Sequence, residues 1–157
     1  VLDEIVLSRA TTEEACAEFQ HRFGRHLAGI VIYGDASGNQ RQTTGSTDYQ
    51  IIKRYMTYHG LGAVSYKVPA ANPSVRHRVQ LVNAKLRNAA GLATLAADPK
   101  CKELIKDFDE VRYKPDSAQI DKDRDPKRTH LSDALGYLLW QEFGPRPVAG
   151  EQGQRLL

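Results

Sequence analysis

Hydrophobic residues recur along the chain with two different periods, which predict two kinds of element. Short apolar runs that end near Gly or Pro predict β-strands at 2–7, 30–33, 63–68 and 92–96. Apolar residues three and four positions apart predict helices that begin near residues 11, 47, 73, 99 and 130. Because strands and helices alternate, the pattern predicts an α/β domain with parallel pairing in the middle of its sheet.

Signals at the helix ends support these positions. Thr11 with Glu14 three residues later has the pattern of a capping box. The last helix, 130–143, carries leucines along one wide face, which predicts firm packing on the sheet. The segments without regular periodicity are predicted to be a hairpin at 111–120, a mixed-charge loop at 121–128 and a C-terminal tail at 144–157.

The composition is typical of one globular domain. The 157 residues are 41% hydrophobic and 26% charged, and no run of about 18 apolar residues predicts a membrane span. Cys16 and Cys101 lie far apart and lack the paired spacing of a zinc site, so both are expected to be buried thiols. The formal net charge of +3 favours a polyanionic partner only weakly.

Asp35 follows the apolar run 30–33 and Gly34, at the point where the predicted strand ends. Ligands of open α/β sheets bind beyond the carboxyl ends of the strands, which makes this carboxylate a candidate for chemistry. Asp followed by Ser and Gly is also typical of a turn, so the alternative that Asp35 only opens a turn stays open. The polar stretch 36–45 lacks the Gly-Lys-Ser/Thr of a P-loop, so no ATP hydrolysis is expected from this chain.

The first turn of the helix 130–143 carries His130 and Asp133 on one side. An acid in a first turn can simply complement the positive end of the helix dipole. That role explains neither the neighbouring imidazole nor Gly136, whose missing side chain would permit close approach of the sheet. This helix therefore offers the second set of candidate residues.

Metal-assisted phosphodiester hydrolysis needs groups of this kind. Carboxylates from a strand end and a packed helix can hold two divalent cations about 4 Å apart, which activate water and stabilise the leaving oxygen. Asp35 and Asp133 are the predicted catalytic and metal-binding acids, with Mg²⁺ or Mn²⁺ as the cofactor. His130 is predicted to be a third ligand, which suits Mn²⁺, or to transfer a proton.

Several basic residues are candidates for sequence-independent contact with DNA phosphates. A solvated helix face is the alternative for those in the predicted helix that follows Pro73. The candidates are Arg76, Arg78, Lys85, Lys127 and Arg128.

Five motifs follow one another along 2–140: Leu-Asp-Glu-Ile-Val-Leu, Thr-Thr-Glu-Glu, Val-Ile-Tyr-Gly-Asp-Ala-Ser-Gly, Asn-Pro with Arg-Val and Val-Asn-Ala, and His-Leu-Ser-Asp-Ala-Leu-Gly-Tyr. Together they resemble the nuclease domain of tailed-phage terminase large subunits. The resemblance implies an RNase H-like mixed sheet with helices on both faces. It matches Asp35 to the acid that ends the family's fourth strand, Asp133 to the acid of the C-terminal helix, and His130 to a histidine that some members place before it.

The resemblance also implies what the protein does and with which partners. The family cuts concatemeric double-stranded viral DNA by a two-metal mechanism during packaging. Its expected partners are duplex DNA, a portal protein and a small terminase subunit, with no membrane. Its expected location is the cytoplasm of an infected bacterium.

One feature of the family has no counterpart in this chain. A first acid lies on the opening strand of the family's sheet, ahead of the strand that 2–7 resembles, and Asp3 and Glu4 lie on the wrong strand to replace it. The resemblance therefore implies that 1–143 is a nuclease domain without its first strand or two and without the ATPase domain. Such a chain is expected to cut slowly or not at all. The alternative is that Asp35 is itself the first-strand acid of a complete small nuclease.

The leading hypothesis is a metal-dependent endodeoxyribonuclease of a DNA-packaging motor. The second is a non-catalytic DNA-binding or assembly module, which the missing acid favours. Binding that weakens steeply with salt and brings no cleavage would distinguish it. The third is a resolvase or another RNase H-like nuclease, which would prefer branched DNA or RNA–DNA hybrids to plain duplex.

Overall fold

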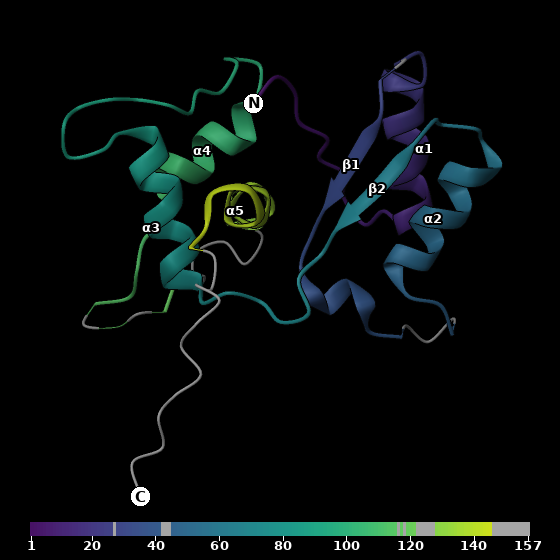
Figure 1. Ribbon diagram of the computed structural model, residues 1–157. Helices are drawn as coiled ribbons and strands as arrows, with labels where there is room; N and C mark the ends of the chain where they lie inside the picture. The colour runs from purple at the N-terminus through teal and green to yellow at the C-terminus, as the bar shows by residue number, and fades with distance from the viewer. Residues whose placement is uncertain (27, 42–44, 116, 118, 122–127, 146–157) are drawn as a thin grey trace, which may run out of the picture.

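The computed structural model describes residues 1–26, 28–41, 45–115, 117, 119–121 and 128–145. Within them the chain forms five α-helices, one 3₁₀ helix and two strands (Figure 1). In chain order these are α1 Thr12–Phe23, β1 Ile30–Tyr33, η1 Ala36–Asn39, α2 Asp48–Tyr58, β2 Val64–Lys67, α3 Val75–Leu86, α4 Lys102–Glu110 and α5 His130–Phe143. The predicted α/β class is confirmed, although the described chain is mostly helical.

The two strands are parallel and lie side by side. Their register places Ile30 opposite Val64 and Tyr33 opposite Lys67. The Ile30 amide donates to the Ala63 carbonyl at 2.8 Å. A parallel pair needs a crossover connection, and α2 supplies it between β1 and β2. The parallel pairing predicted from the apolar runs 30–33 and 63–68 is thus confirmed.

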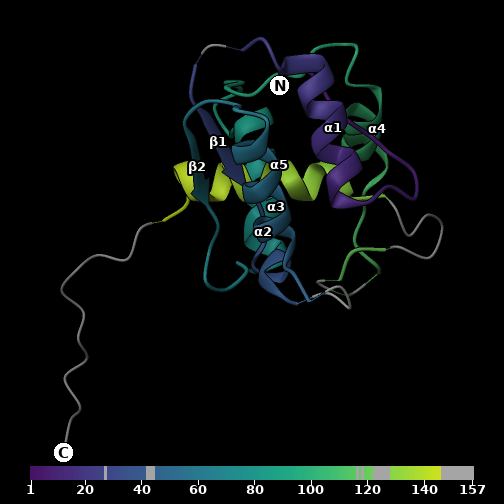
Figure 2. The same ribbon diagram turned by 90° about the vertical axis from the view of Figure 1, so that its right-hand side faces the viewer.

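Helices lie on both sides of these strands. α1 packs on α2 at one side, while α3 and α4 pack on α5 at the other, where α5 also contacts β1 (Figure 1). Figure 2 shows that α5 runs across the direction of the strands. In the described part of the chain, no helix has the length and hydrophobicity needed to cross a lipid bilayer.

Two predicted strands are wrong. Residues 2–7 and 92–96 form no strand, although the two segments meet at one end. The Val1 amino group donates to the Ala96 carbonyl at 2.6 Å, and the Asp98 amide donates to the Val1 carbonyl at 2.9 Å. The hydrogen bonds do not continue as a ladder, and an apolar run becomes a strand only where a partner strand is beside it. The exposed apolar side chains of the first segment are Leu2, Val6 and Leu7.

Most helix starts follow the sequence signals. Thr11 and Thr47 each cap a helix in a capping box, and α5 spans 130–143 as predicted. The hairpin predicted at 111–120 is reduced to one antiparallel bridge between Tyr113 and Ile120.

α4 begins later than predicted, at Lys102, and a distant residue caps it. Its own N-cap residue, Cys101, provides no side-chain hydrogen bond. The Glu4 carboxylate instead accepts hydrogen bonds from the amides of Glu103 and Leu104, at 3.0 and 2.9 Å. The N-terminal segment is thereby attached to α4.

Few apolar side chains of the described residues are fully buried. Cys16 and Cys101 are among them as free thiols, as predicted, and burial raises the pKa of Cys16. The remaining ones are Met56, Val82, Leu104, Tyr137 and Leu139. All but Met56 of these five belong to α3, α4 and α5, so most of the core lies between these three helices.

Candidate functional site

Asp35 lies two residues beyond the last residue of β1 and caps η1. One carboxylate oxygen, Oδ1, accepts from the Gly38 amide at 3.0 Å and from the Ser37 hydroxyl. The turn role considered for Asp35 is therefore present. Only one of the two oxygens takes part in it, so the turn leaves Oδ2 free to bind a ligand.

Tyr49 of α2 packs under this turn and fixes its backbone. The Tyr49 hydroxyl donates to the Asp35 carbonyl at 2.7 Å. A Cβ atom at Gly34 would overlap that hydroxyl, and one at Gly38 would lie 2.7 Å from the Tyr49 ring. Burial raises the pKa of Tyr49 to about 12, with a further contribution from the carboxylates of Asp35 and Asp48. The two glycines thus permit the close approach that positions Asp35.

Asp133, in the first turn of α5, is paired with an arginine of α3. Nη1 of Arg78 donates to Asp133 Oδ1 at 2.8 Å and to the Asp133 carbonyl at 3.3 Å. The Arg78 guanidinium also lies over the Tyr137 ring, 4.1 Å from its centre. Arg78 is 4% exposed, whereas the Asp133 side chain keeps 28% of its surface accessible. The charge of Asp133 therefore compensates a buried cation.

Gly136 does not have the role expected from the sequence. An added Cβ atom would lie 3.6 Å from Arg78, which is ordinary contact, and no strand atom is among its nearest neighbours. The glycine thus faces α3 and not the sheet.

The Tyr137 phenol is influenced electrostatically by both acids. Burial raises the pKa of the Tyr137 phenol, the Arg78 guanidinium lowers it, and the carboxylates of Asp35 and Asp133 raise it further. Both acids therefore act electrostatically on one hydroxyl, and α5, which carries Asp133, contacts β1, the strand that Asp35 follows. Nearly one hundred residues separate them in the sequence, and each carboxylate has its own partners: Ser37 and Gly38 for Asp35, and Arg78 for Asp133.

His130 is exposed at the first position of α5. It borders a surface hollow together with residues 5–8 of the N-terminal segment. Among the described residues it forms no hydrogen bond or ion pair, and the Asp107 carboxylate caps α5 by accepting from the Ser132 amide at 3.0 Å. The structure therefore does not join His130 to Asp35 or Asp133.

Three of the predicted DNA-binding residues lie on α3, and two of them, Arg76 and Arg78, lie on opposite sides of it. Arg76 is exposed, as a phosphate contact requires. Arg78 is buried between α3 and α5, so its charge is used internally by Asp133 and is not presented to a ligand at the surface. The prediction that Arg78 contacts phosphate is therefore corrected: its position is that of an internal ion-pair partner.

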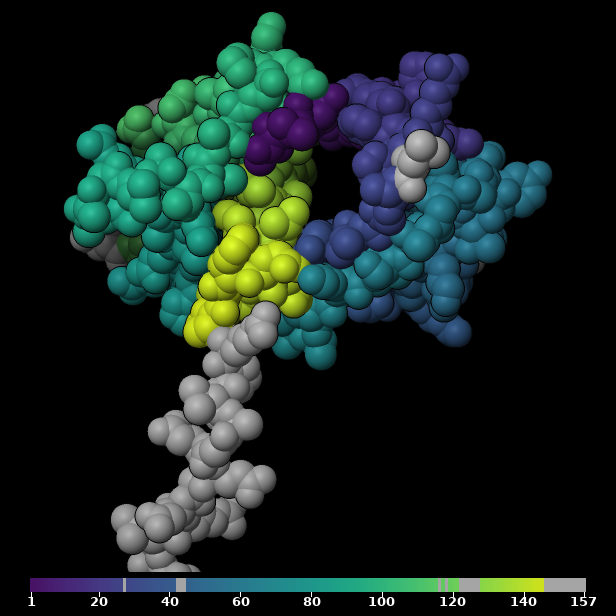
Figure 3. Space-filling model, turned by 45° about the horizontal axis from the view of Figure 1, so that its top comes forward, coloured from purple at the N-terminus to yellow at the C-terminus, as the bar shows by residue number. Residues whose placement is uncertain are grey.

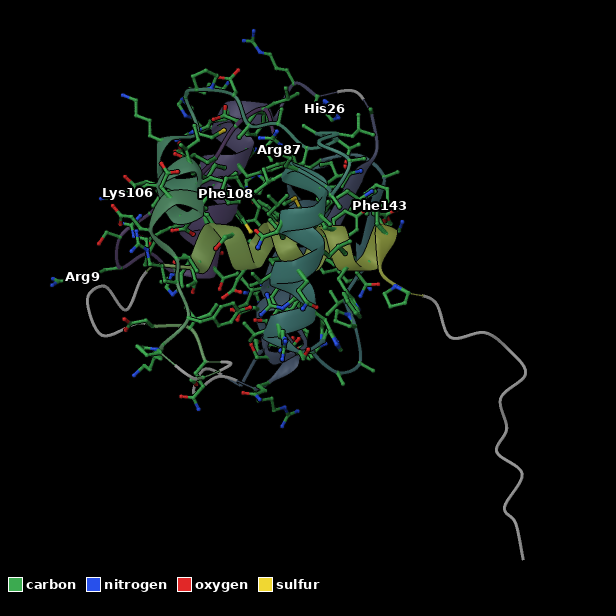
Figure 4. All side chains as sticks on the ribbon, turned by 90° about the vertical axis from the view of Figure 1, so that its left-hand side faces the viewer. Arg9, His26, Arg87, Lys106, Phe108 and Phe143 are labelled. Atoms are coloured by element: carbon green, nitrogen blue, oxygen red, sulfur yellow. The ribbon has the colours of Figure 1, made fainter. Side chains whose placement is uncertain are left out.

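The other predicted DNA-binding residues also have internal neighbours or lie outside the described residues. The Lys85 ammonium lies 4.0 Å from the ring centre of Phe143, which Figure 4 labels at the end of α5. The Arg128 side chain is 14% exposed, and Lys127 lies outside the described residues. The acids that Arg128 pairs with are Glu103, Asp107 and Glu110.

The described residues fit a divalent cation only in part. Mg²⁺ binds through one or two carboxylates and keeps waters and phosphate oxygens as its other ligands, a set that Asp35 and Asp133 can begin. In the part of the chain that the structure describes, no group of three or more His, Cys, Asp or Glu side chains is suited to hold a metal. The two acids, Asp35 and Asp133, therefore fall short of the set that two cations need.

Sequence reasoning missed Arg78 as a structural partner and both tyrosines. One signal for Arg78 was present, because it lies within the apolar stripe of α3, three residues after Val75 and four before Val82. A signal for a bulky neighbour of Asp35 was also present, in the glycines at 34 and 38.

Comparison of the chain with protein-family models, with curated proteins and with solved structures finds no match.

Proposed function

We propose that the chain carries the nuclease domain of a viral DNA-packaging terminase, a metal-dependent endodeoxyribonuclease that acts on concatemeric duplex DNA. The observation that carries the proposal is that α5, whose first turn holds Asp133, contacts β1, the strand that Asp35 follows. The order of the motifs along 2–140 supports it, as does the position of Asp35 directly beyond a parallel strand. The RNase H-like sheet, the second metal ion, the portal and small-subunit partners and the bacterial cytoplasm belong to the same proposal.

Each residue of the site has a role in it. Asp35 and Asp133 would hold Mg²⁺ or Mn²⁺, which activates water and stabilises the leaving oxygen when bound. Arg78 orients Asp133 through one carboxylate oxygen and leaves the other oxygen to the ligand. Tyr49 fixes the backbone of Asp35 by its hydrogen bond.

Two further residues have proposed roles at the edge of the site. Arg76, exposed on α3, contacts the DNA backbone. His130, also exposed, transfers a proton or binds a cation once DNA is present.

The test is plasmid nicking with Mn²⁺ by the full-length natural polypeptide that contains residues 1–157. Asp35→Asn keeps an oxygen that can cap η1 and removes the charge, so it is expected to lower the cutting rate about 100-fold without unfolding the protein. Asp109→Asn, at an exposed position of α4, is the matched control and is expected to cut normally. Full activity of Asp35→Asn would contradict the proposal.

One observation favours a second function, a non-catalytic DNA-binding or assembly module. It is the shortage of metal ligands among the described residues. Under this alternative the wild-type polypeptide binds duplex DNA with steep salt dependence and leaves it uncut in the presence of Mn²⁺.

A further inference from the structure

A pocket between α3, α4 and α5 has no role in the candidate site. Its volume is about 200 Å³. Tyr113 and Ile120, the two residues of the antiparallel bridge, complete its wall. Figure 3 shows α3 and α4 on one side of α5 and an opening beside β1 on the other side, so the pocket and that opening are separate.

The pocket has an apolar part large enough for one ring. Figure 4 shows Phe108 on the side of α4 that faces α3. The other apolar residues of the wall are Val79, Val82, Val111 and Ile120. An apolar cavity of about 150 Å³ in another protein takes up benzene, so a pocket of this size and lining accommodates a single ring.

The charges in the wall do not balance. Asp133 pairs with Arg78 at 2.8 Å, and the Asp107 carboxylate lies 3.5 Å from Nη1 of Arg128. Arg112 also lines the pocket and is exposed, so it lies at the mouth. Within the described part of the chain, its side chain forms no hydrogen bond or ion pair. A ligand therefore meets one unbalanced positive charge at the mouth of the pocket.

We propose that this pocket binds a small organic anion, with one apolar or aromatic ring inside the pocket and a carboxylate or phosphate group against Arg112. A guanidinium binds either group through two parallel hydrogen bonds. Two sources share this chemistry, a free aromatic acid and a pyrimidine nucleotide. Asp133 is part of the wall, so the bound ligand lies beside one acid of the candidate site.

The proposal depends on the pocket and not on the nuclease function, and ligand-observed NMR titration tests it without any activity. The protein is the full-length natural polypeptide that contains residues 1–157. The probes are benzoate and deoxythymidine monophosphate. Benzyl alcohol and thymidine keep the two rings and lack the anionic group. At least one anionic probe is expected to bind saturably, about fivefold more tightly than its uncharged counterpart.

Three variants locate the binding. Arg112→Gln removes the charge at an exposed position and is expected to weaken binding about fivefold, the upper end of what an exposed ion pair contributes. Arg54→Gln, at an exposed position of α2 outside the pocket, is the matched control and is expected to bind as wild type does. Val79→Phe fills the apolar part and is expected to abolish binding.

The anionic probe that binds more tightly identifies the source, and either result supports the proposal. Absence of saturable binding by both anionic probes would overturn it. Equal affinity of wild type and Arg112→Gln would also overturn it, as would unchanged binding by Val79→Phe. Failure to cut DNA with intact binding of an anionic probe would refute the proposed function alone.

Discussion

The two acids of the candidate site have opposite surroundings. Asp35 bonds to an amide and a hydroxyl in a surface turn, and no cation among the described residues pairs with it. Asp133 pairs with Arg78, which is 4% exposed and stacked on Tyr137. The same residue type therefore has two settings: the charge of Asp35 is available to a ligand alone, whereas Asp133 also balances the buried charge of Arg78 through one of its oxygens.

The largest expected effect is a difference in unfolding free energy between a variant of Asp133 and a variant of Asp35. Asp133→Ala leaves a buried guanidinium without its partner and is expected to cost about 3 kcal/mol of unfolding free energy. The measurement is urea unfolding followed by the fluorescence of Trp140, the single tryptophan. Asp35→Asn is the comparison and is expected to cost far less.

A double variant checks the cause of that loss. Replacing both partners, as Arg78→Met with Asp133→Leu, removes the buried charge and is expected to restore most of the stability, because an apolar pair of similar volume tolerates burial. A double variant as unstable as Asp133→Ala alone would mean that the ion pair is not what Asp133 contributes.

The second effect concerns the packing of Tyr49 against Gly34, which positions Asp35. Gly34→Ala is expected to cost about 2 kcal/mol, because the new methyl group overlaps the Tyr49 hydroxyl and must displace it. Adding Tyr49→Phe removes that oxygen and is expected to recover part of the loss. Gly29→Ala is the control, since its Cβ atom would lie 3.4 Å from the nearest atom. Equal costs at 34 and 29 would argue against the close packing under Asp35.

A smaller effect distinguishes two properties of Asp35: its role as a hydrogen-bond acceptor at the start of η1, and its negative charge. Asp35→Ala removes the acceptor for the Gly38 amide and is expected to cost about 1 kcal/mol, the usual contribution of an N-cap. Asp35→Asn keeps an acceptor and is expected to stay close to wild type in urea unfolding. If Asp35→Asn proved as unstable as Asp133→Ala, the contrast between the two acids would be lost.

The smallest effect is a dependence of stability on alkaline pH. Burial raises the pKa of Tyr49 from its ordinary value of 10.0 to about 12, so the folded state holds this proton more tightly than the unfolded state. The resulting stabilisation is complete below pH 10 and is lost as the pH rises from about 10 through about 12. Unfolding of wild type and Tyr49→Phe between pH 9 and 12 measures it, and the variant is expected to lose less stability over this range.

The sequence predicts the local elements of this fold well and the long-range contacts poorly. The capping boxes at Thr11 and Thr47 and the apolar face of 130–143 depend on neighbouring residues, and they appear in the structure as expected. The strand predicted at 2–7 depended on a partner strand that the described residues lack. The start of α4 depended on Glu4, about one hundred residues away, which no local pattern indicates.

In the candidate site, too, the sequence predicts what depends on neighbouring residues and misses what depends on long-range packing. The position of Asp35 after a strand and of Asp133 in a first turn could be read from the sequence, because each is a local property. The internal role of Arg78 could not, because a charge on a helix is usually solvated and only the packing of α3 on α5 decides otherwise. The same packing decides which basic residues remain for DNA, and it leaves Arg76 exposed.

The central claim is that Asp35 and Asp133 serve one divalent cation, and Mn²⁺ binding to residues 1–157 tests it most directly. Free Mn²⁺ is measured by electron paramagnetic resonance in titrations of wild type, Asp35→Asn and Asp109→Asn. The account predicts that Asp35→Asn binds Mn²⁺ at least about tenfold more weakly, a change of about 1.4 kcal/mol, while Asp109→Asn binds as wild type does. Equal affinity of wild type and Asp35→Asn would contradict it.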